Sequence, residues 1–274
     1  MTEAMCFVDE HLLQVGTLAF HCEHPIRHVP QGRLPVEKPR PLVEAYAELS
    51  RTLRPQRIVE LGVYKGGSTA LLNELARPEK LVSFELSAEP APILVEYIDE
   101  HGLSATVRPY FGVNQADRAK LAAVVTAEFG GEPLDLVIDD ASHLYDESVA
   151  SFETLFPLVR PGGLYLIEDW RWQHQMADGA ASIRPSDDLT ESARRAIAER
   201  MTQLAEGRDT RVVPLSLLVL QLVLARASAG DVVAEVAIGP YWAAVRRGEH
   251  ALDADIFRVA DTVRDHFRLL SSTA

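Results

Sequence analysis

Cysteine, basic residues and long apolar runs are scarce in this chain of 274 residues. The two cysteines, Cys6 and Cys22, indicate no disulfide framework. Lysine and arginine number 27 against 40 aspartates and glutamates, and the net charge of -13 argues against nucleic acid or an anionic membrane as a partner. The longest apolar stretch, residues 215–225, is far shorter than the ~18 residues that span a bilayer, so we expect a buried helix or an oligomer contact there.

The first ten residues lack the basic start and apolar core of a signal peptide, which favours a cytoplasmic protein. Residues 1–40 show weak periodicity and end in a proline-rich connector, so we interpret them as an N-terminal extension or lid ahead of one large domain, residues 41–274. The extension contains His21, Cys22, His24 and His28. Their spacing matches no paired zinc motif, which favours a structural interpretation over a metal site.

From residue 41 onward, strand and helix signals alternate. A helical stripe covers 41–53, and β-rich runs are expected at 58–61, 81–85, 105–110, 134–138 and 164–168. Helices are expected between them at 68–76, 91–101, 117–128 and 146–159. This alternation predicts βαβ crossovers and therefore a doubly wound, Rossmann-like α/β fold with a parallel sheet.

After residue 169 the pattern changes. We expect residues 170–210 to form a substrate loop with a lid helix near 190–206, followed by an apolar helix at 215–227. Residues 231–247 predict two strands joined at Gly239-Pro240, which is a C-terminal antiparallel hairpin, and a last helix is expected near 252–270. Five parallel strands followed by a hairpin do not resemble the all-parallel dehydrogenase sheet.

A glycine-rich turn follows the first of the parallel strands. The strand stops at Gly62, and the turn contains Gly66 and Gly67 before a helix begins. Glycine lets the backbone approach a nucleotide-like ligand closely because it has no Cβ. The G-x-x-x-G-G spacing differs from the dinucleotide motif G-x-G-x-x-G, and the acidic Glu60 precedes the first glycine. This combination indicates S-adenosylmethionine as the ligand.

Two glutamates end successive strands on either side of this turn. Glu60 could meet the ammonium group of a methionine moiety, and Glu85 could accept hydrogen bonds from both hydroxyls of a ribose. Each could instead be a solvated strand end. Two acids at successive strand ends with a glycine loop between them favour the binding interpretation.

Acidic residues also end the fourth and fifth strands, whose ends are neighbours in an open parallel sheet. Asp139 or Asp140 would therefore face Glu168 and Asp169. Converging carboxylates repel one another unless a cation lies between them, and oxygen ligands suit Mg²⁺ before Ca²⁺ or Mn²⁺. The alternative is that these acids cap helices or stay hydrated.

His143 lies in the loop that follows these aspartates. A histidine beside a cation and a cofactor could remove a proton from a substrate hydroxyl, because its ordinary pKa lies near neutrality. A lone histidine is more often structural, but the neighbouring carboxylates favour the catalytic interpretation.

Four motifs, in chain order, resemble those of one known family: Val59–Ser68, Gly112–Arg118, Val137–His143 and Ile167–Asp169. Together they resemble the macrocin and mycinamicin sugar O-methyltransferases, to which cephalosporin-hydroxylase-like and rhamnosyl O-methyltransferase proteins are related. The match covers roughly residues 57–170. The expected hairpin is similar to the end of the seven-stranded sheet of class I methyltransferases, whose last strand inserts antiparallel.

The resemblance implies an S-adenosylmethionine-dependent and Mg²⁺-dependent O-methyltransferase that acts on a hydroxyl of a small molecule, such as a sugar or natural product. It implies His143 as the catalytic base. The implied cofactor-binding residues are Glu60, Gly62, Tyr64, Gly66, Ser68, Glu85, Gln115, Asp117 and Asp139. The implied magnesium ligands are Asp139, Glu168 and Asp169. The chain departs from the family pattern at Asn114, where an aspartate is common, and in Trp170–His174, which leaves the substrate open.

Two other interpretations stay open. One is a methyltransferase that positions its substrates without a metal and uses the acids as a hydrogen-bond network. The other is a non-catalytic protein that keeps the fold, binds the cofactor or forms a homo-oligomer through residues 215–225. An iron hydroxylase is disfavoured, because the chain shows no His-x-Asp/Glu facial-triad motif. Trp170 and Trp172 are candidate walls for a sugar or aromatic ring.

Overall fold

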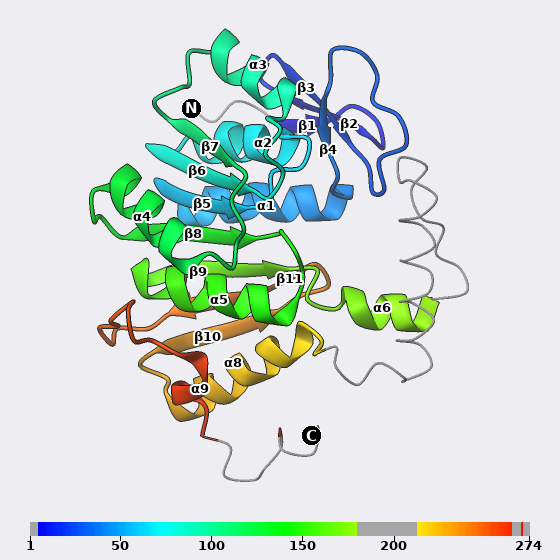
Figure 1. Cartoon of the computed structure of the whole chain (residues 1–274). Helices are drawn as coiled ribbons and strands as arrows, with labels where there is room; N and C mark the ends of the chain where they lie inside the picture. The colour runs from blue at the N-terminus through cyan, green and yellow to red at the C-terminus, as the bar shows by residue number, and fades with distance from the viewer. Residues whose placement is uncertain (1–4, 180–212, 265–269, 271–274) are drawn as a thin grey trace.

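The structure is a computed structural model that describes residues 5–179, 213–264 and 270. Its centre is a seven-stranded sheet (Figure 1). The strands are β5 (Arg57–Leu61), β6 (Lys80–Glu85), β7 (Val107–Phe111), β8 (Leu134–Asp139), β9 (Val159–Glu168), β10 (Val233–Ile238) and β11 (Trp242–Arg247). Their order across the sheet is β10-β11-β9-β8-β5-β6-β7. The expected Rossmann-like, seven-stranded α/β fold is confirmed.

The C-terminal hairpin closes one side of this sheet. β11 pairs antiparallel with both β9 and β10, so the last strand of the chain inserts between two earlier ones. β5, β6, β7, β8 and β9 pair in parallel. Leu61 is in register with Asp139, and Asp139 is in register with Ile167. The carboxyl ends of β5, β8 and β9 therefore lie side by side, as the sequence predicts.

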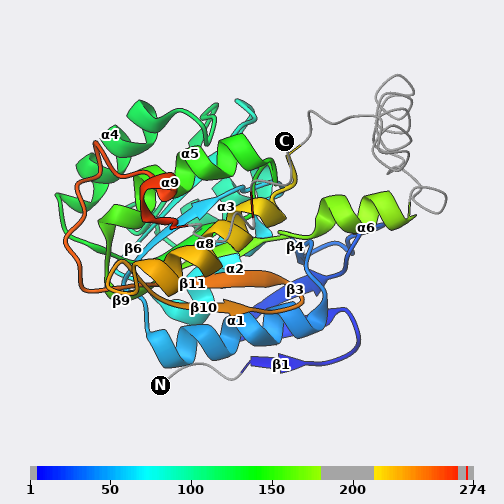
Figure 2. The ribbon, with the colours of Figure 1, turned by 90° about the horizontal axis from the view of Figure 1, so that it is seen from below.

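Helices cover both faces of the sheet (Figure 2). The helices are α1 (Arg40–Leu53), α2 (Gly67–Ala76), α3 (Pro92–Glu100), α4 (Arg118–Phe129), α5 (Tyr145–Leu155), α6 (Trp172–Gly179), α8 (Ser216–Ser228) and α9 (Val259–Thr262), with a 3-10 turn over Phe156–Leu158. Two apolar clusters result, one under α1, α2 and α3 and the other under α4, α5 and α8. β8 is buried along its whole length, because it lies at the centre of the sheet with helices above and below.

A second, four-stranded sheet is formed by the N-terminal segment. It consists of β1 (Met5–Phe7), β2 (Leu12–Val15), β3 (Leu18–Cys22) and β4 (Leu34–Val36). Its buried side chains, among them Leu13, Phe20 and Val36, belong to the same apolar cluster as residues of α1, α2 and α3. The sequence analysis expected no strands here, because runs of three to five residues are too short to show a clear alternation.

Two further expectations concern the C-terminal half of the chain. The expected lid helix near 190–206 lies outside the described residues. The helix expected near 252–270 is wrong at its start, because residues 252–258 are not helical. Within the part of this range that the structure describes, Val259–Thr262 alone forms a short helix. The Asp253 carboxylate accepts the Asp255 backbone N–H, and this local turn competes with helix formation.

The apolar helix expected at 215–227 is confirmed as α8. Leu218, Val219 and Leu222 are buried against the sheet, whereas Leu220 and Val223 are exposed. None of the helices within the described ranges is both long and apolar enough to cross a membrane.

Candidate active site

The glycine loop after β5 is a point of close approach between protein segments. Gly62 has a φ of +93°, and a Cβ added there would lie 2.1 Å from the carbonyl oxygen of Asp140 in the loop after β8. A Cβ on Gly67 would lie 1.8 Å from the carbonyl oxygen of Pro35 in β4. Gly66, at a φ of +87°, caps α2 and faces Leu94. These glycines are therefore required by packing within the chain, in addition to any approach to a ligand.

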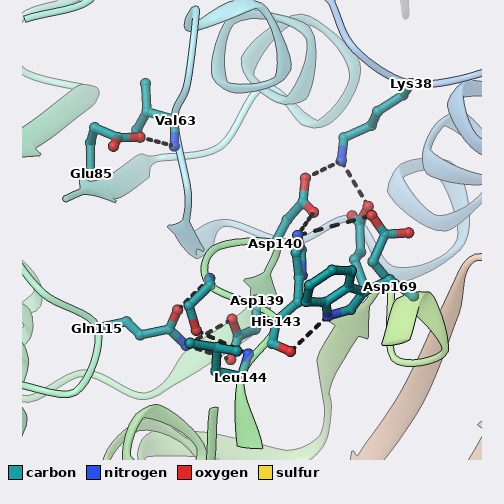
Figure 3. Close-up of polar contacts among 12 residues, drawn as sticks. Lys38, Val63, Glu85, Gln115, Asp139, Asp140, His143, Leu144 and Asp169 are labelled. Atoms are coloured by element: carbon teal, nitrogen blue, oxygen red, sulfur yellow. Dashed lines mark hydrogen bonds and ion pairs between the residues drawn. The ribbon is translucent and has the colours of Figure 1, made fainter. Parts of the chain in front are cut away.

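Glu85 holds this loop in place from the end of β6. One oxygen of its carboxylate accepts the backbone N–H group of Val63 at 3.0 Å (Figure 3). The same oxygen accepts the N–H of Tyr64 at 2.8 Å. The other oxygen accepts the N–H of Ser87. Glu85 also lines a cavity of about 270 Å³ whose apolar walls include Phe84, Leu86 and Val113. It therefore lies where the sequence analysis expected a ribose-binding acid.

Glu60 is buried beneath the loop, at 2% exposure. Its carboxylate accepts a hydrogen bond from the Thr69 hydroxyl at 2.6 Å. Burial raises the pKa of Glu60 to about 7, although hydrogen bonds from Thr69 and Ser68 act in the opposite direction. Glu60 is absent from the lining of both cavities beside the loop, whereas Ser68 lines the larger one. A direct contact between Glu60 and a cofactor is therefore not supported by this geometry.

Asp139 is also buried, at 2% exposure, on the far side of the strand from the acidic loop residues. The hydroxyls of Ser151 and Tyr165 donate to one of its oxygens at 2.9 Å and 3.0 Å, and Gln115 Nε2 donates at 3.2 Å to the other. Burial raises the pKa of Asp139 to about 6, against the effect of these hydrogen bonds. Gln115 in turn accepts the N–H of Ser142, so this network fixes the loop that follows β8.

Asp117, which the sequence predicts to be near the cofactor, is hydrogen-bonded to neither Glu85 nor the Asp139 network. Its carboxylate accepts the backbone N–H of Lys120 at 3.0 Å and caps α4. Its side chain is absent from the lining of both cavities beside the glycine loop. The sequence motif placed it near the cofactor, and the structure gives it a helix-capping role instead.

Three residues at the ends of β8 and β9 converge: Asp140, His143 and Asp169, with one ligand atom of each within 4.8 Å of the others. His143 Nε2 lies 3.8 Å from Asp140 Oδ1 and 4.0 Å from Asp169 Oδ2 (Figure 3). His143 and Asp169 adopt φ angles of +55° and +47°, which are uncommon for residues with a side chain. Such backbone angles often occur at functional sites.

Two tryptophans support the loops of this cluster. Trp172 Nε1 donates to the backbone oxygen of His143 at 2.8 Å, and its ring contacts the imidazole edge-on. Trp170 Nε1 donates to the backbone oxygen of Gly239 at 3.2 Å. Both indole N–H groups are thus used within the chain, and Trp172 helps to hold His143 in its orientation.

Lys38, from the connection between β4 and α1, reaches the same region from the N-terminal side. Its Nζ donates to Asp140 Oδ2 at 2.6 Å and to Glu168 Oε2 at 2.7 Å. The other Glu168 oxygen accepts a hydrogen bond from the Tyr46 hydroxyl. Although burial alone would lower the pKa of Lys38, the carboxylates of Asp140 and Glu168 raise it above its ordinary value. Burial raises the pKa of Glu168, and Lys38 opposes that rise.

A second cavity, of about 380 Å³, lies beside the converging residues. Its lining includes His143, Asp169, Lys38, Lys65 and Ser68. Both cavities are lined by Gly62, Tyr64, Asp140 and Ala141. The two spaces therefore meet at the glycine loop, with Glu85 on one side and His143 on the other.

The predicted magnesium ligands do not come together as a set. Asp139 points into the Gln115–Ser151–Tyr165 network, and Glu168 is engaged by Lys38 and Tyr46. Of the three, Asp169 alone lies in the convergent cluster, where Asp140 is the second carboxylate. Two carboxylates with room for water fit the coordination that Mg²⁺ commonly adopts in proteins.

Comparison with known proteins agrees with this architecture. The model of the methyltransferase domain family matches residues 59–170, from β5 and its glycine loop to the acidic end of β9. Residues 59–170 thus match a methyltransferase domain. The matched stretch contains every residue of this site named above except Pro35, Lys38, Tyr46, Trp172 and Gly239.

Curated relatives match this chain over shorter stretches. A stretch of 91 residues is 41% identical to 8-demethyl-8-(2-methoxy-alpha-L-rhamnosyl)-tetracenomycin-C 3'-O-methyltransferase of Streptomyces olivaceus, over 33% of this chain and 23% of that protein. A stretch of 66 residues is 46% identical to demethylmacrocin O-methyltransferase of Streptomyces fradiae, over 24% of this chain and 16% of that protein. The matched stretches thus span less than a quarter of either relative.

A solved structure shows the same fold. The MycE methyltransferase from the mycinamycin biosynthetic pathway, in complex with Mg, SAH and mycinamycin VI, superimposes with a TM-score of 0.50 at 22% sequence identity. The superposition covers 78% of this chain and 50% of that chain. The seven-stranded sheet with its inserted antiparallel strand is therefore the class I methyltransferase fold.

Sequence reasoning missed Lys38 and Tyr46, and it left Asp139 and Asp140 unresolved. Lysine is among the residues least often buried, so nothing in the local sequence marks Lys38 as part of a site. Asp139 and Asp140 point to opposite sides of the strand end, and only the pairing of β8 with β5 and β9 decides which one faces Asp169.

Proposed function

We propose that this protein is an S-adenosylmethionine-dependent O-methyltransferase that acts on a hydroxyl of a small molecule, with a sugar of a natural product as the acceptor class. The observation that carries the proposal is the meeting of two cavities at the glycine loop of a methyltransferase domain, one containing Glu85 and the other His143. The names of the relatives, which specify O-methylation of rhamnosyl tetracenomycin and demethylmacrocin, support the acceptor class.

In this proposal the adenosine part of the cofactor occupies the 270 Å³ cavity. The apolar walls there suit an adenine ring, and Glu85 has the position and charge to accept hydrogen bonds from ribose hydroxyls. The backbone of Gly62 to Ser68 then borders the methionine part in the larger cavity. Glu60 acts indirectly by holding Thr69, and Gln115 acts by holding the loop after β8.

His143 is the proposed catalytic base. S-Adenosylmethionine supplies an electrophilic methyl group: the bond from this carbon to sulfur breaks as the bond to the acceptor oxygen forms, and S-adenosylhomocysteine leaves. The acceptor hydroxyl loses its proton to His143 Nε2. Asp140 and Asp169, at 3.8 Å and 4.0 Å from Nε2, attract the imidazolium that results. The contact from Trp172 keeps the imidazole oriented during this transfer.

Asp140 and Asp169 are the residues that would hold a divalent cation in this site, with Mg²⁺ as the proposed ion. Such an ion supplies Lewis-acid polarisation of the acceptor oxygen and fixes its orientation. The solved structure of MycE in complex with Mg supports the choice of ion.

A metal-independent methyltransferase is the second candidate, and the contacts of Lys38 favour it. The Lys38 ammonium already offsets one of the two negative charges of Asp140 and Glu168, which reduces the need for a metal ion there. Turnover in EDTA separates the two candidates. The magnesium proposal expects activity to fall at least ~10-fold in EDTA and to return with added Mg²⁺. Full activity in EDTA would leave only the metal-independent form.

The methyl-transfer proposal is tested by release of S-adenosylhomocysteine with demethylmacrocin and rhamnosyl tetracenomycin C as acceptors. Wild type is expected to turn over at least one acceptor, and His143→Asn to lose roughly 10²- to 10⁴-fold in kcat. His250→Asn, a change of an exposed histidine after β11 that lies outside both cavities, is the matched control. Equal kcat values for His143→Asn and wild type would exclude His143 as the base.

A further inference from the structure

Lys38 is a buried cation in a place where the sequence analysis expected a metal ion. Its side chain is 6% exposed, and its Nζ lies between the carboxylates of Asp140 and Glu168. These carboxylates belong to the ends of two neighbouring parallel strands, β8 and β9. One of the positive charges that would balance the converging acids is thus supplied by the chain itself.

The carboxylates of Glu168 and Asp140 differ in how many of their oxygens have a hydrogen-bond donor from the protein. Glu168 is 2% exposed, and each of its oxygens already has a protein donor, Lys38 on one side and Tyr46 on the other. Asp140 is 27% exposed and gives only Oδ2 to Lys38, while Oδ1 faces His143 at 3.8 Å. Glu168 borders a separate cavity of about 140 Å³, but each of its oxygens is already engaged by a protein donor. Asp140 instead has one oxygen without such a donor, on the side of the 380 Å³ cavity.

Lys38 contacts the fold through both its backbone and its ammonium group. Its backbone N–H donates to the oxygen of Val36 at the end of β4, and its Nζ lies 5.4 Å from the centre of the Tyr46 ring in α1. Tyr46 in turn packs edge-on against Trp242 of β11. The ammonium group is thus held from the N-terminal sheet, α1 and the C-terminal hairpin at once.

We propose that Lys38 is a positioning residue that serves as the resident cation of Asp140 and Glu168, excludes Glu168 from metal coordination, and turns Asp140 toward His143 and Asp169. The inference rests on the proposed function only in placing an exchangeable divalent cation at Asp140 and Asp169. A cation at that place has two carboxylate ligands and lies near a fixed positive charge, so its binding is weak. Removing Lys38 frees Glu168 as a third carboxylate and strengthens binding.

The test is the affinity of the whole protein for Mn²⁺, measured by electron paramagnetic resonance without cofactor or acceptor. Lys38→Met keeps the length and apolar stem of the side chain but removes its charge. We expect it to bind Mn²⁺ about tenfold or more tightly than wild type, and to melt roughly 10 °C lower without metal. Lys65→Met is the matched control, because Lys65 lines the same cavity and its Nζ lies over the Tyr64 ring. We expect this control to change the affinity less than threefold.

Two further variants show whether Glu168 is the ligand that Lys38 excludes. Glu168→Gln alone is expected to leave Mn²⁺ affinity within threefold of wild type. The double variant Lys38→Met/Glu168→Gln is expected to lose the gain of the single Lys38 change. A tenfold loss in Glu168→Gln would overturn the inference, and this arm decides the matter if Lys38→Met does not fold.

An unchanged or weaker Mn²⁺ affinity in Lys38→Met, with the fold retained by circular dichroism, would also overturn the inference. If wild type binds no Mn²⁺ while Lys38→Met does, the metal of the proposed function fails and the role of Lys38 stands. The two proposals therefore fail by different results.

Discussion

At the scale of single residues, the acids of the site fall into two environments. Glu60 and Asp139 are buried, and burial raises the pKa of each to about 7 and about 6. Asp140 and Asp169 are partly or largely exposed beside His143. All four lie near strand ends, so the sequence does not show which of them are buried and which are exposed. That depends on the side of the sheet to which each side chain points, and a shift of one residue in the strand register reverses it.

The raised pKa of Glu60 predicts a particular dependence of stability on pH. A carboxyl with a folded pKa of about 7 and an ordinary value of 4.5 binds its proton more tightly in the folded state. Its contribution to the free energy of unfolding is therefore greatest at low pH and is lost as pH rises through the range between those values. Asp139 acts in the same direction over a range that ends near pH 6.

Glu60→Gln removes this titration while keeping an oxygen for the Thr69 hydroxyl. At pH 8 we expect the variant to be more stable than wild type by up to about 3 kcal/mol, and at pH 4.5 to be nearly equal to it. Urea denaturation at several pH values measures both, with the exposed Glu96→Gln as the control. The pKa explanation is wrong if wild type and Glu60→Gln show the same slope of stability against pH.

At the scale of helices and strands, most of the central sheet could be predicted from the sequence. From residue 41 to α5, the expected elements begin within about two residues of the observed ones, because buried β-rich runs and glycine turns are strong local signals. The exceptions that follow are β9 and α6, since Trp172–Gly179 forms a helix where the sequence predicts a loop. β9 begins earlier than the expected residue 164, at Val159, because Pro161, Gly162 and Gly163 are part of the strand. Such features depend on partners distant in sequence, which local patterns do not reveal.

The contact between β4 and the start of α2 is one such long-range feature, and it gives a prediction. An alanine at Gly67 would place its Cβ 1.8 Å from the Pro35 oxygen, so β4 or the glycine loop must move. We expect Gly67→Ala to cost roughly 1–3 kcal/mol of stability, although alanine favours helices. Gly239→Ala is the control, because a Cβ there makes ordinary contact at 3.5 Å, and a change below about 0.5 kcal/mol is expected. Thermal or urea denaturation compares the two. Equal stability of Gly67→Ala and wild type would contradict the close packing of β4.

At the scale of the whole molecule, the division of the chain into an extension, residues 1–40, and a domain, residues 41–274, stays a proposal. The N-terminal sheet shares an apolar cluster with α1, α2 and α3, and Lys38 ties its end to β8 and β9. These contacts favour a fixed layer over a segment that opens and closes. The sequence could not reveal this, because each short strand contributes few side chains to the shared cluster.

Phe20→Ala tests this integration. Phe20 is fully buried in β3, so we expect a loss of about 3–5 kcal/mol. If the sheets unfold together, far-UV circular dichroism and tryptophan fluorescence report one coincident transition, since all three tryptophans lie outside the N-terminal sheet. Val8→Ala, at a side chain with 63% exposure, should have little effect. An early transition that leaves the tryptophan signal unchanged would instead support an independent N-terminal unit.

The central claim is that S-adenosylmethionine binds at the glycine loop beside Glu85, and isothermal titration of the whole protein tests it directly. We expect saturable binding of S-adenosylmethionine to wild type with one site per chain, and no binding of NADH. Glu85→Ala should weaken binding at least ~10-fold, because a ribose partner and the anchor of the loop are both lost. Glu89→Ala, at an exposed glutamate beyond the same strand, should leave the affinity unchanged. No binding by folded wild-type protein, or NADH binding in its place, would contradict the account.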